Sequence, residues 1–218
     1  MARIIVLMGP QGAGKGTQAQ MLARRLRIPV VATGEILREV ARLDTPLGHQ
    51  VKEAQALGQL VSDWVLAEIV SERLSREDCA RGCLLDGFPR TLPQARLLDN
   101  IAVNRNLEVL VINIDVPRGQ LWKRLAGRRT CSSCGTIYNV YFRPSKQDGV
   151  CDLDGQPLYA RTDDNDEAIA RRLAAYDEMT GPVLGHYRGQ SKLHDIDGAA
   201  APAEVYQSLE NVVSSFAV

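Results

Sequence analysis

A short apolar run leads directly into a glycine-rich loop near the start of the chain. Residues 4–8 read Ile-Ile-Val-Leu-Met, a continuous β-branched pattern that is typical of a parallel strand buried on both faces. Residues 9–17 follow as Gly-Pro-Gln-Gly-Ala-Gly-Lys-Gly-Thr, and a helix is expected from about Lys15 to Arg27. This strand–loop–helix order predicts an α/β fold built on a central parallel sheet.

The glycine loop has the properties of a phosphate-binding loop. Its glycines let backbone N–H groups surround an anion, the helix N-terminus adds a partial positive charge, and Lys15 can reach the outer phosphates. The hydroxyl comes one residue later than usual, at Thr17, because Gly16 follows the lysine. A glycine-rich turn with an incidental lysine is the alternative. The residues expected at the phosphates are Gly12, Ala13, Gly14, Lys15, Gly16 and Thr17.

Strands and helices alternate along the rest of the chain, which implies right-handed crossovers in one sheet. A long charged helix from Asp166 to Tyr187 should bend at Gly181–Pro182. A helical block, 33–74, and a cysteine-containing block, 127–164, do not fit the alternation and are interpreted as insertions on one core domain. The other expected elements are strands at 29–32, 83–86, 109–115 and 193–196 and helices at 93–103, 121–126 and 203–213.

The composition excludes several classes of partner. Among the 218 residues, 26 Lys and Arg balance 26 Asp and Glu, so net charge gives no reason to expect non-specific binding to nucleic acid or a membrane surface. No apolar run approaches the roughly 18 residues of a membrane span, and residues 4–8 are too short for a signal peptide. A cytoplasmic location is the default expectation.

Three of the five cysteines are clustered. Cys131 and Cys134 precede Cys151 and Asp154 in a C-x2-C…C-x2-D arrangement, which matches structural zinc sites with an aspartate as fourth ligand. Four protein ligands would leave no open position for water, so the site is predicted to be structural. Iron or cobalt could take the same ligands, and reduced thiols without metal are the alternative. Cys79 and Cys83 are interpreted as free thiols.

Several motifs together resemble the nucleoside-monophosphate kinases, in particular the long-lid bacterial adenylate kinases with a zinc-binding lid. The resemblance covers essentially the whole chain, and the motifs occur in the order of the family. Besides the glycine loop they are Thr33–Arg38 (TGEILR), Asp86–Arg90 (DGFPR) with Gln94 after it, Gly127–Arg129, Arg161–Asp164 and Arg171–Leu173. The resemblance implies a P-loop three-layer fold with a helical NMP-binding insertion at 33–62, whose helical pattern continues to 74, and a lid at 127–164.

The resemblance also implies an activity: reversible phosphoryl transfer from Mg·ATP to AMP by a cytoplasmic monomer. Positioning and electrostatics can catalyse this reaction, and arginine suits it because its planar guanidinium matches phosphate geometry and stays charged. Asp86 would help hold magnesium through water; a structural salt bridge is the alternative. Arg124 could be an ordinary solvated charge. The residues expected to act on phosphate are Lys15, Arg38, Arg90, Arg124, Arg128, Arg161 and Arg172.

The acceptor pocket is expected to favour AMP over UMP or GMP. Gln94 carries an amide that can donate and accept together against the edge of adenine. The other expected AMP contacts are Thr33, Gln59, Leu60, Val61, Gly87, Phe88 and Pro89. On the ATP side, the resemblance implies contacts from Tyr138, Gly198 and Ala200, whereas Asn139 replaces a histidine that is common in the family.

Two other functions compete with this interpretation. The nearest is the same chemistry on UMP or GMP, against which Thr33 and Gln94 argue. The other is a nucleotide switch with a nucleic-acid-binding zinc module, which Arg128, Arg129, Arg143 and Lys146 favour slightly. The block 127–164 also contains five aspartates and lacks alternating aromatic and basic residues, which argues against that function.

Overall fold

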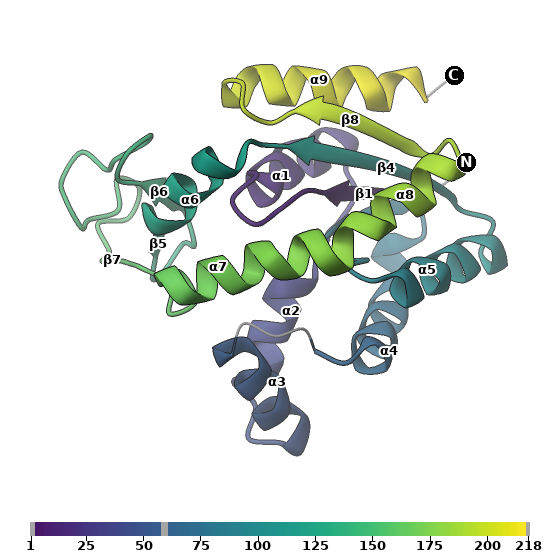
Figure 1. Ribbon diagram of the computed structural model, residues 1–218, viewed down its shortest axis with the longest axis horizontal. Helices are drawn as coiled ribbons and strands as arrows, with labels where there is room; N and C mark the ends of the chain where they lie inside the picture. Colours follow the sequence, from purple (N-terminus) through teal and green to yellow (C-terminus); the bar gives the residue numbers. More distant parts are fainter. Residues whose placement is uncertain (1–2, 58–60, 217–218) are drawn as a thin grey trace.

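The protein is built on a five-stranded parallel sheet between two layers of helices (Figure 1). The computed structural model describes residues 3–57 and 61–216. The strand order is β2-β3-β1-β4-β8, and the central strand β1 pairs with β3 and β4, so that Ile5 lies opposite Leu84 and Leu110. The strands are β1 (Arg3–Met8), β2 (Val30–Ala32), β3 (Gly82–Asp86), β4 (Glu108–Asp115) and β8 (Leu193–Asp197). The predicted α/β P-loop architecture is confirmed.

Each face of this sheet has its own hydrophobic core. Ile4 and Val6 of β1 point to one face and Ile5 and Leu7 to the other, and all four are at most 2% exposed. Helices α4, α5 and α8 cover the first face, and α1, α6, α7 and α9 the second. The helices span α1 (Lys15–Leu26), α4 (Asp63–Leu74), α5 (Leu92–Asn104), α6 (Arg118–Ala126), α7 (Asp166–Ala175), α8 (Gly181–Gly189) and α9 (Pro202–Ser215). Burial on both faces explains why β1 is apolar at consecutive positions.

Helices α2 (Thr33–Val40) and α3 (Pro46–Ala56) extend away from the sheet and lie at the bottom of Figure 1. They follow β2 immediately, so the chain leaves the core beside the carboxyl end of that strand. Helix α4 then returns the chain to the core, where Val65, Leu66 and Val70 are buried. A short 3-10 helix, Glu77–Cys79, leads into β3.

The cysteine-containing block forms a second, smaller sheet beyond the ends of α6 and α7 (Figure 1). Its antiparallel strands are β5 (Arg128–Cys131), β6 (Ile137–Asn139) and β7 (Leu158–Tyr159), in the order β6-β5-β7. The apolar cluster of this block contains only Cys131, Tyr138 and Cys151, with Leu158 packed against it. So small a core needs additional support to hold the strands together.

The long charged helix is divided differently from the prediction. Asn165 starts it, because its Oδ1 accepts a hydrogen bond from the N–H of Ala168 at 2.9 Å. The distortion is a π-helical turn, Tyr176–Thr180 (η2), immediately before Pro182. A proline lacks an N–H and its ring crowds the preceding turn, so a widened turn accommodates it without a sharp kink. In the described residues, every helix is too short or too polar to cross a membrane.

Candidate active site and metal centre

The loop between β1 and α1 is shaped to bind an anion. Gly12 and Gly14 have φ values of 87° and 94°, a left-handed conformation that side chains disfavour. A Cβ at Gly9 would lie 2.5 Å from the carbonyl oxygen of Ile114, so the loop also packs closely against β4. Gly14 is the N-cap of α1 and provides no side-chain cap. The first N–H groups of the helix are therefore free for a ligand such as phosphate.

Lys15 lies at the base of this loop, where its ammonium donates hydrogen bonds to the carbonyl oxygens of Gly9 at 2.7 Å and Pro10 at 2.9 Å. Burial, with smaller contributions from the nearby Arg90 and Arg172, lowers the pKa of Lys15 to about 8, against the opposing effect of Asp86. The site therefore concentrates positive charge, and a bound polyphosphate would relieve the repulsion.

A cavity of about 1180 Å³ opens at the carboxyl ends of the central strands and contains most of the predicted site. This is where open parallel sheets bind their ligands. Predicted site residues that line it are Gly12, Ala13, Gly14, Lys15, Gly16, Thr17, Arg38, Asp86, Gly87, Phe88, Pro89, Arg90, Arg124, Arg128, Tyr138, Arg161, Arg172, Gly198 and Ala200. The structure thus brings together residues from both ends of the chain.

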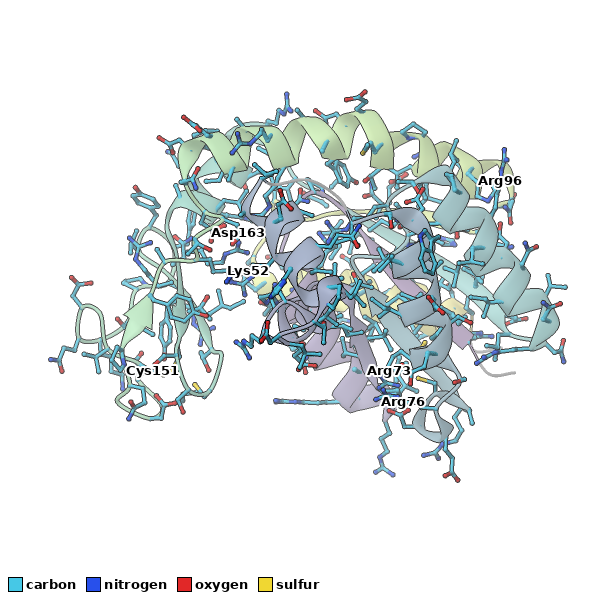
Figure 2. The ribbon with its side chains drawn as sticks, turned by 90° about the horizontal axis from the view of Figure 1, so that it is seen from below. Lys52, Arg73, Arg76, Arg96, Cys151 and Asp163 are labelled. Atoms are coloured by element: carbon cyan, nitrogen blue, oxygen red, sulfur yellow. The ribbon has the colours of Figure 1, made fainter. Side chains whose placement is uncertain are left out.

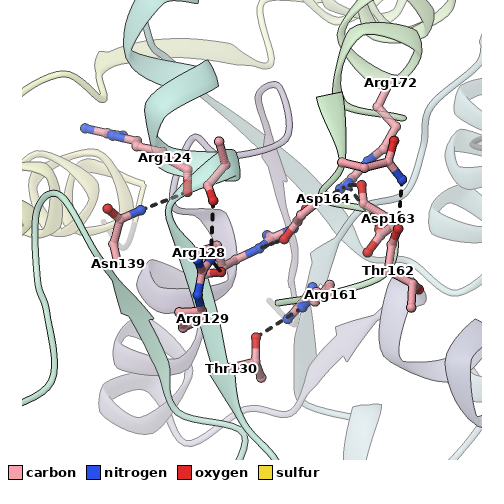
Figure 3. Close-up of polar contacts among 12 residues, drawn as sticks. Arg124, Arg128, Arg129, Thr130, Asn139, Arg161, Thr162, Asp163, Asp164 and Arg172 are labelled. Atoms are coloured by element: carbon pink, nitrogen blue, oxygen red, sulfur yellow. Dashed lines mark hydrogen bonds and ion pairs between the residues drawn. The ribbon is translucent and has the colours of Figure 1, made fainter. Parts of the chain in front are cut away.

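Two of the arginines are held by one buried carboxylate (Figure 3). Asp164, whose side chain is 1% exposed, accepts from Nε of Arg128 at 2.7 Å and from Nη1 of Arg172 at 3.2 Å. Asp163 also pairs with Arg172, at 3.0 Å. The paired aspartates fix the guanidinium planes before any substrate arrives, which is a form of electrostatic preorganisation.

Two other arginines also line the cavity, and nearby carboxylates balance less of their positive charge. Arg161 contacts Thr130 at 3.4 Å, and burial together with Arg128 and Arg38 lowers its pKa to about 10. Arg90 donates from Nε to the carbonyl oxygen of Gly87 at 2.7 Å, and burial likewise lowers its pKa. Both cations are costly without a counter-ion, so they favour an anionic ligand.

Two further residues predicted to bind ATP, Arg124 at the phosphates and Tyr138 at the base, take up different positions. Arg124 donates from Nη2 to the carbonyl oxygen of Gly198 at 3.0 Å, which places α6 beside the loop after β8. Tyr138 borders the cavity but is only 3% exposed. Its hydroxyl accepts a hydrogen bond from the N–H of Asp152 at 2.8 Å and lies 3.5 Å from Cys151 Sγ. Its main contacts are therefore inside the small sheet.

Several residues predicted for the acceptor pocket lie off the cavity. Thr33 is buried and donates to the carbonyl oxygen of Asp86 at 3.2 Å, and Val61 packs in the core. Gln94 is 1% exposed, and both ends of its amide have partners in the protein. Gln59 and Leu60 lie outside the described residues. Contacts of these residues with the adenine of AMP therefore remain predictions.

The clustered cysteines meet the geometry of a tetrahedral metal site. The ligand atoms of Cys131, Cys134, Cys151 and Asp154 all lie within 4.8 Å of one another. The Sγ atoms of Cys134 and Cys151 are 3.7 Å apart, and Cys131 Sγ is 3.3 Å from Asp154 Oδ1. Two sulfur ligands at about 2.3 Å from one zinc ion would lie about 3.8 Å apart in a tetrahedron. The donor set therefore fits zinc, and Figure 2 shows Cys151 at the opposite side of the view from Arg73 of α4.

Asp86 offers a carboxylate for a hard cation next to the phosphate loop. It ends β3, lines the cavity, and its Oδ2 lies 3.5 Å from the position that a Cβ at Gly16 would occupy. The missing side chain at Gly16 leaves room for hydrated magnesium between this carboxylate and a bound phosphate chain. Carboxylate oxygens and retained waters are the ligands that magnesium prefers.

A phosphate loop at the carboxyl edge of a parallel sheet, facing arginines on separate elements, defines a P-loop phosphotransferase. The adenylate kinase family model matches residues 7–192. The chain is 46% identical to the adenylate kinase of Methanocella arvoryzae, over 97% of this chain and 99% of that protein. It is 44% identical to those of Carboxydothermus hydrogenoformans and Staphylococcus aureus, in each case over 96% of this chain and 98% of the relative. The chain belongs to the adenylate kinase family.

The sequence does not predict the contacts that fix the arginines of the site, nor those that join the small sheet to α6. Asp163 and Asp164 were noted as part of a motif, without the contacts they make to Arg128 and Arg172. Asn139 also lines the cavity and joins β6 to the end of α6 through its side-chain amide. A polar residue at the end of a short strand, before a turn, is a weak signal, because such residues are common there.

Proposed function

We propose that this protein transfers the γ-phosphoryl group of Mg·ATP to AMP, reversibly, to give two molecules of ADP. The observation that carries the proposal is the convergence of Lys15 and six arginines on one cavity that begins at a phosphate loop. These six are Arg38, Arg90, Arg124, Arg128, Arg161 and Arg172; a seventh arginine, Arg143, also lines the cavity. Such a set can hold two phosphate chains at once, as transfer between nucleotides requires.

The elements divide these cations into two groups. Arg38 on α2 and Arg90 after β3 would hold the AMP phosphate, because both lie on the side of the cavity that Gly34 and Gly87 also line. Arg124, Arg128, Arg161 and Arg172 would surround the phosphates of ATP and the group in transfer. Lys15 would exchange its carbonyl partners for phosphate oxygens. These groups stabilise the charge that develops on the equatorial oxygens.

Magnesium and the metal of the small sheet would have separate roles. Asp86 would hold magnesium through water, and the bound ion would supply positive charge that offsets the charge of the phosphates. The Cys131, Cys134, Cys151 and Asp154 cluster would hold zinc and keep the small sheet folded. Its ligands are separate from the residues that hold phosphate, so we assign it no part in the transfer itself.

The two insertions would act as covers. Residues 33–62 would close over AMP and the lid, residues 127–164, over ATP, since Arg38 lies on the first and Arg128 and Arg161 on the second. Closure would exclude water and so prevent hydrolysis of ATP. We also expect a monomer that works in the cytoplasm, as the family implies; light scattering of the purified protein would check the first point.

The test is a panel of acceptors. Purified protein is mixed with Mg·ATP and, separately, AMP, GMP, UMP or CMP, and ADP formation is measured. Rapid turnover with AMP alone is the expected result. Preference for another monophosphate would retain the mechanism and overturn the acceptor pocket. Absence of transfer to every acceptor, with ATP still bound, would overturn the roles of the arginines.

A further inference from the structure

A closed ring of hydrogen bonds surrounds the side chain of Gln94. Its Nε2 donates to Asp63 Oδ1 at 2.7 Å, and Asp63 Oδ2 accepts from the hydroxyl of Thr91 at 3.0 Å. The Thr91 hydroxyl oxygen in turn accepts from the backbone N–H of Gln94 at 3.4 Å, as the N-cap of α5. Gln94 Oε1 accepts from the backbone N–H of Arg90 at 2.8 Å.

The chemistry of these partners determines which way the amide points. A backbone N–H can only donate, so the atom facing Arg90 must be the oxygen of Gln94. An ionised carboxylate can only accept, so the atom facing Asp63 must be the nitrogen. Rotating the amide by 180° would place two donors together at Arg90 and two acceptors together at Asp63. Both ends therefore oppose the rotation.

We propose that Asp63 is a specificity-determining positioning residue, which makes Gln94 complementary to adenine and not to a 6-oxopurine. The inference rests on the proposed function and on the expectation from the sequence that the Gln94 amide meets the base of AMP. In the fixed orientation, Gln94 has one N–H and one oxygen lone pair left. Adenine offers an acceptor at N1 and a donor at its 6-amino group, which match them.

A 6-oxopurine presents the opposite pattern, with a donor at N1 and an acceptor at position 6. Inosine monophosphate, IMP, is the sharpest probe, because it differs from AMP only at these positions. To pair with IMP, Gln94 would have to rotate and lose its bonds to both Arg90 and Asp63. The bond to Asp63 is the stronger of the two, because its acceptor is charged.

The test is Asp63→Asn, assayed for kcat/KM with AMP and with IMP as acceptors of phosphate from Mg·ATP. The asparagine keeps the shape of Asp63 but can turn its own amide to serve a rotated Gln94. We expect the AMP-to-IMP ratio to fall by about tenfold or more, the factor that one charge-assisted hydrogen bond supplies. The kcat/KM for IMP should itself increase, and not only its size relative to that for AMP. A side chain that only braced α4 against α5 would not produce such a gain.

Asp78→Asn is the matched control. It removes the same charge from an exposed carboxylate that pairs with Arg73, in the last turn of α4 and so at the opposite end of the helix from Asp63, and the ratio should not change. The pair Thr91→Val and Thr91→Ser gives a second test that does not depend on the folding of Asp63→Asn. The valine should lower the ratio by loosening Asp63, and the serine should keep it because it retains the hydroxyl.

The outcomes separate this inference from the proposed function. If wild-type protein does not phosphorylate AMP, the proposed function itself fails. If it does, but Asp63→Asn and Thr91→Val keep the AMP-to-IMP ratio within about twofold, the role of Asp63 is overturned. A Gln94→Ala variant that retains the full ratio would likewise overturn it, because the base would then be recognised by other groups.

Discussion

Single residues in the cavity show how closely charge and position are linked. Lys15, Arg90 and Arg161 all have pKa values that burial lowers, and each faces further cations. The protein therefore carries an electrostatic cost at the site when no nucleotide is present. Carboxylates offset part of this cost: Asp86 near Lys15, and Asp164 between Arg128 and Arg172.

The first prediction concerns the proton on Lys15. With its pKa lowered to about 8, the folded chain without nucleotide binds fewer protons than the unfolded chain between pH 8 and the ordinary value of 10.5. The contribution of this lysine to stability therefore increases as the pH rises through that window. ATP should restore the charge, so at pH 8.5 binding should take up about 0.75 protons at this residue.

Calorimetric titrations of ATP in two buffers with different ionisation enthalpies would measure this uptake. A Lys15→Met variant is the control, because it keeps much of the side-chain volume but cannot bind a proton. Equal proton uptake by the wild type and the variant would contradict the assignment.

The second prediction concerns the shared carboxylate. Asp164→Asn removes the charge between Arg128 and Arg172 and turns an acceptor into a donor. We expect kcat to fall by about 10- to 100-fold, because guanidinium groups that are no longer held in place stabilise the transition state poorly. Asp163→Asn should cost less, since Asp163 is 36% exposed and pairs with Arg172 alone. Equal kcat values for the two variants, measured at saturating nucleotide, would refute this ranking.

Only part of this residue-scale detail is predictable from sequence. The glycine loop and the C-x2-C…C-x2-D cluster are local patterns whose chemistry follows from spacing, and the structure brings each set together. The pairing of Gln94 with Asp63 joins residues 31 positions apart, and Arg128 meets Asp164 across 36. Spacing carries no signal for such contacts, because they depend on how separate elements pack.

At the scale of elements, Asn139 joins the small sheet to the core. Its Nδ2 donates to the carbonyl oxygen of Arg124 on α6 at 2.9 Å (Figure 3). Its Oδ1 accepts from the N–H groups of Tyr141 and Phe142 at 2.9 and 3.2 Å. One side chain thus fixes both the turn after β6 and the position of that turn on α6. Phe142 lies in that turn and lines the cavity.

The third prediction follows from this contact. Asn139→Ala should raise KM for ATP by about tenfold while KM for AMP changes little, because about 1 kcal/mol is lost for each neutral hydrogen bond that orders the turn. Asn139→Asp should be intermediate, since it keeps the acceptor but not the donor. Gln147→Ala, at an exposed position of the same block, is the control. A parallel rise in both KM values would argue against a role confined to the ATP side.

The fourth prediction concerns the metal site as the support of the small sheet. A core of three residues cannot hold three short strands, so chelation should unfold this block first and lower Tm, and added zinc should restore it. Asp154→Cys should retain the metal against higher chelator concentrations, because thiolate is the softer ligand. Metal analysis and thermal melts would measure both effects. A purified protein without stoichiometric metal, and with a Tm that chelator does not change, would contradict the assignment.

Element type was more predictable than element limits. The buried strands are predicted correctly from the sequence, because burial on both faces makes them apolar at consecutive positions. For the helix around Pro182 the sequence predicts a bend at Gly181–Pro182, and the structure adds a π-helical turn, Tyr176–Thr180, directly before that pair. Proline disturbs the turn before it, and sequence does not show whether that turn bends or widens.

At the scale of the whole molecule, the cavity is built where the core sheet meets α2 and the small sheet. The phosphate loop, Asp86 and Arg90 belong to the core sheet, Arg38 comes from α2, and Arg128 comes from β5. Like charges on three separate bodies repel one another until an anion lies between them. The nucleotides would thus supply the attraction that brings the bodies together.

The fifth prediction tests this coupling of charge to shape. An inhibitor that links two adenosines through five phosphates should fill both nucleotide positions and reduce the radius of gyration in small-angle X-ray scattering. An Arg38→Ala, Arg128→Ala double variant should bind it weakly and contract less at matched concentration, because both covers lose their charge. Inorganic phosphate alone should contract the protein less than the inhibitor, since it cannot span the two sites. Equal radii with and without the inhibitor, at saturation confirmed by calorimetry, would show that binding does not close the insertions.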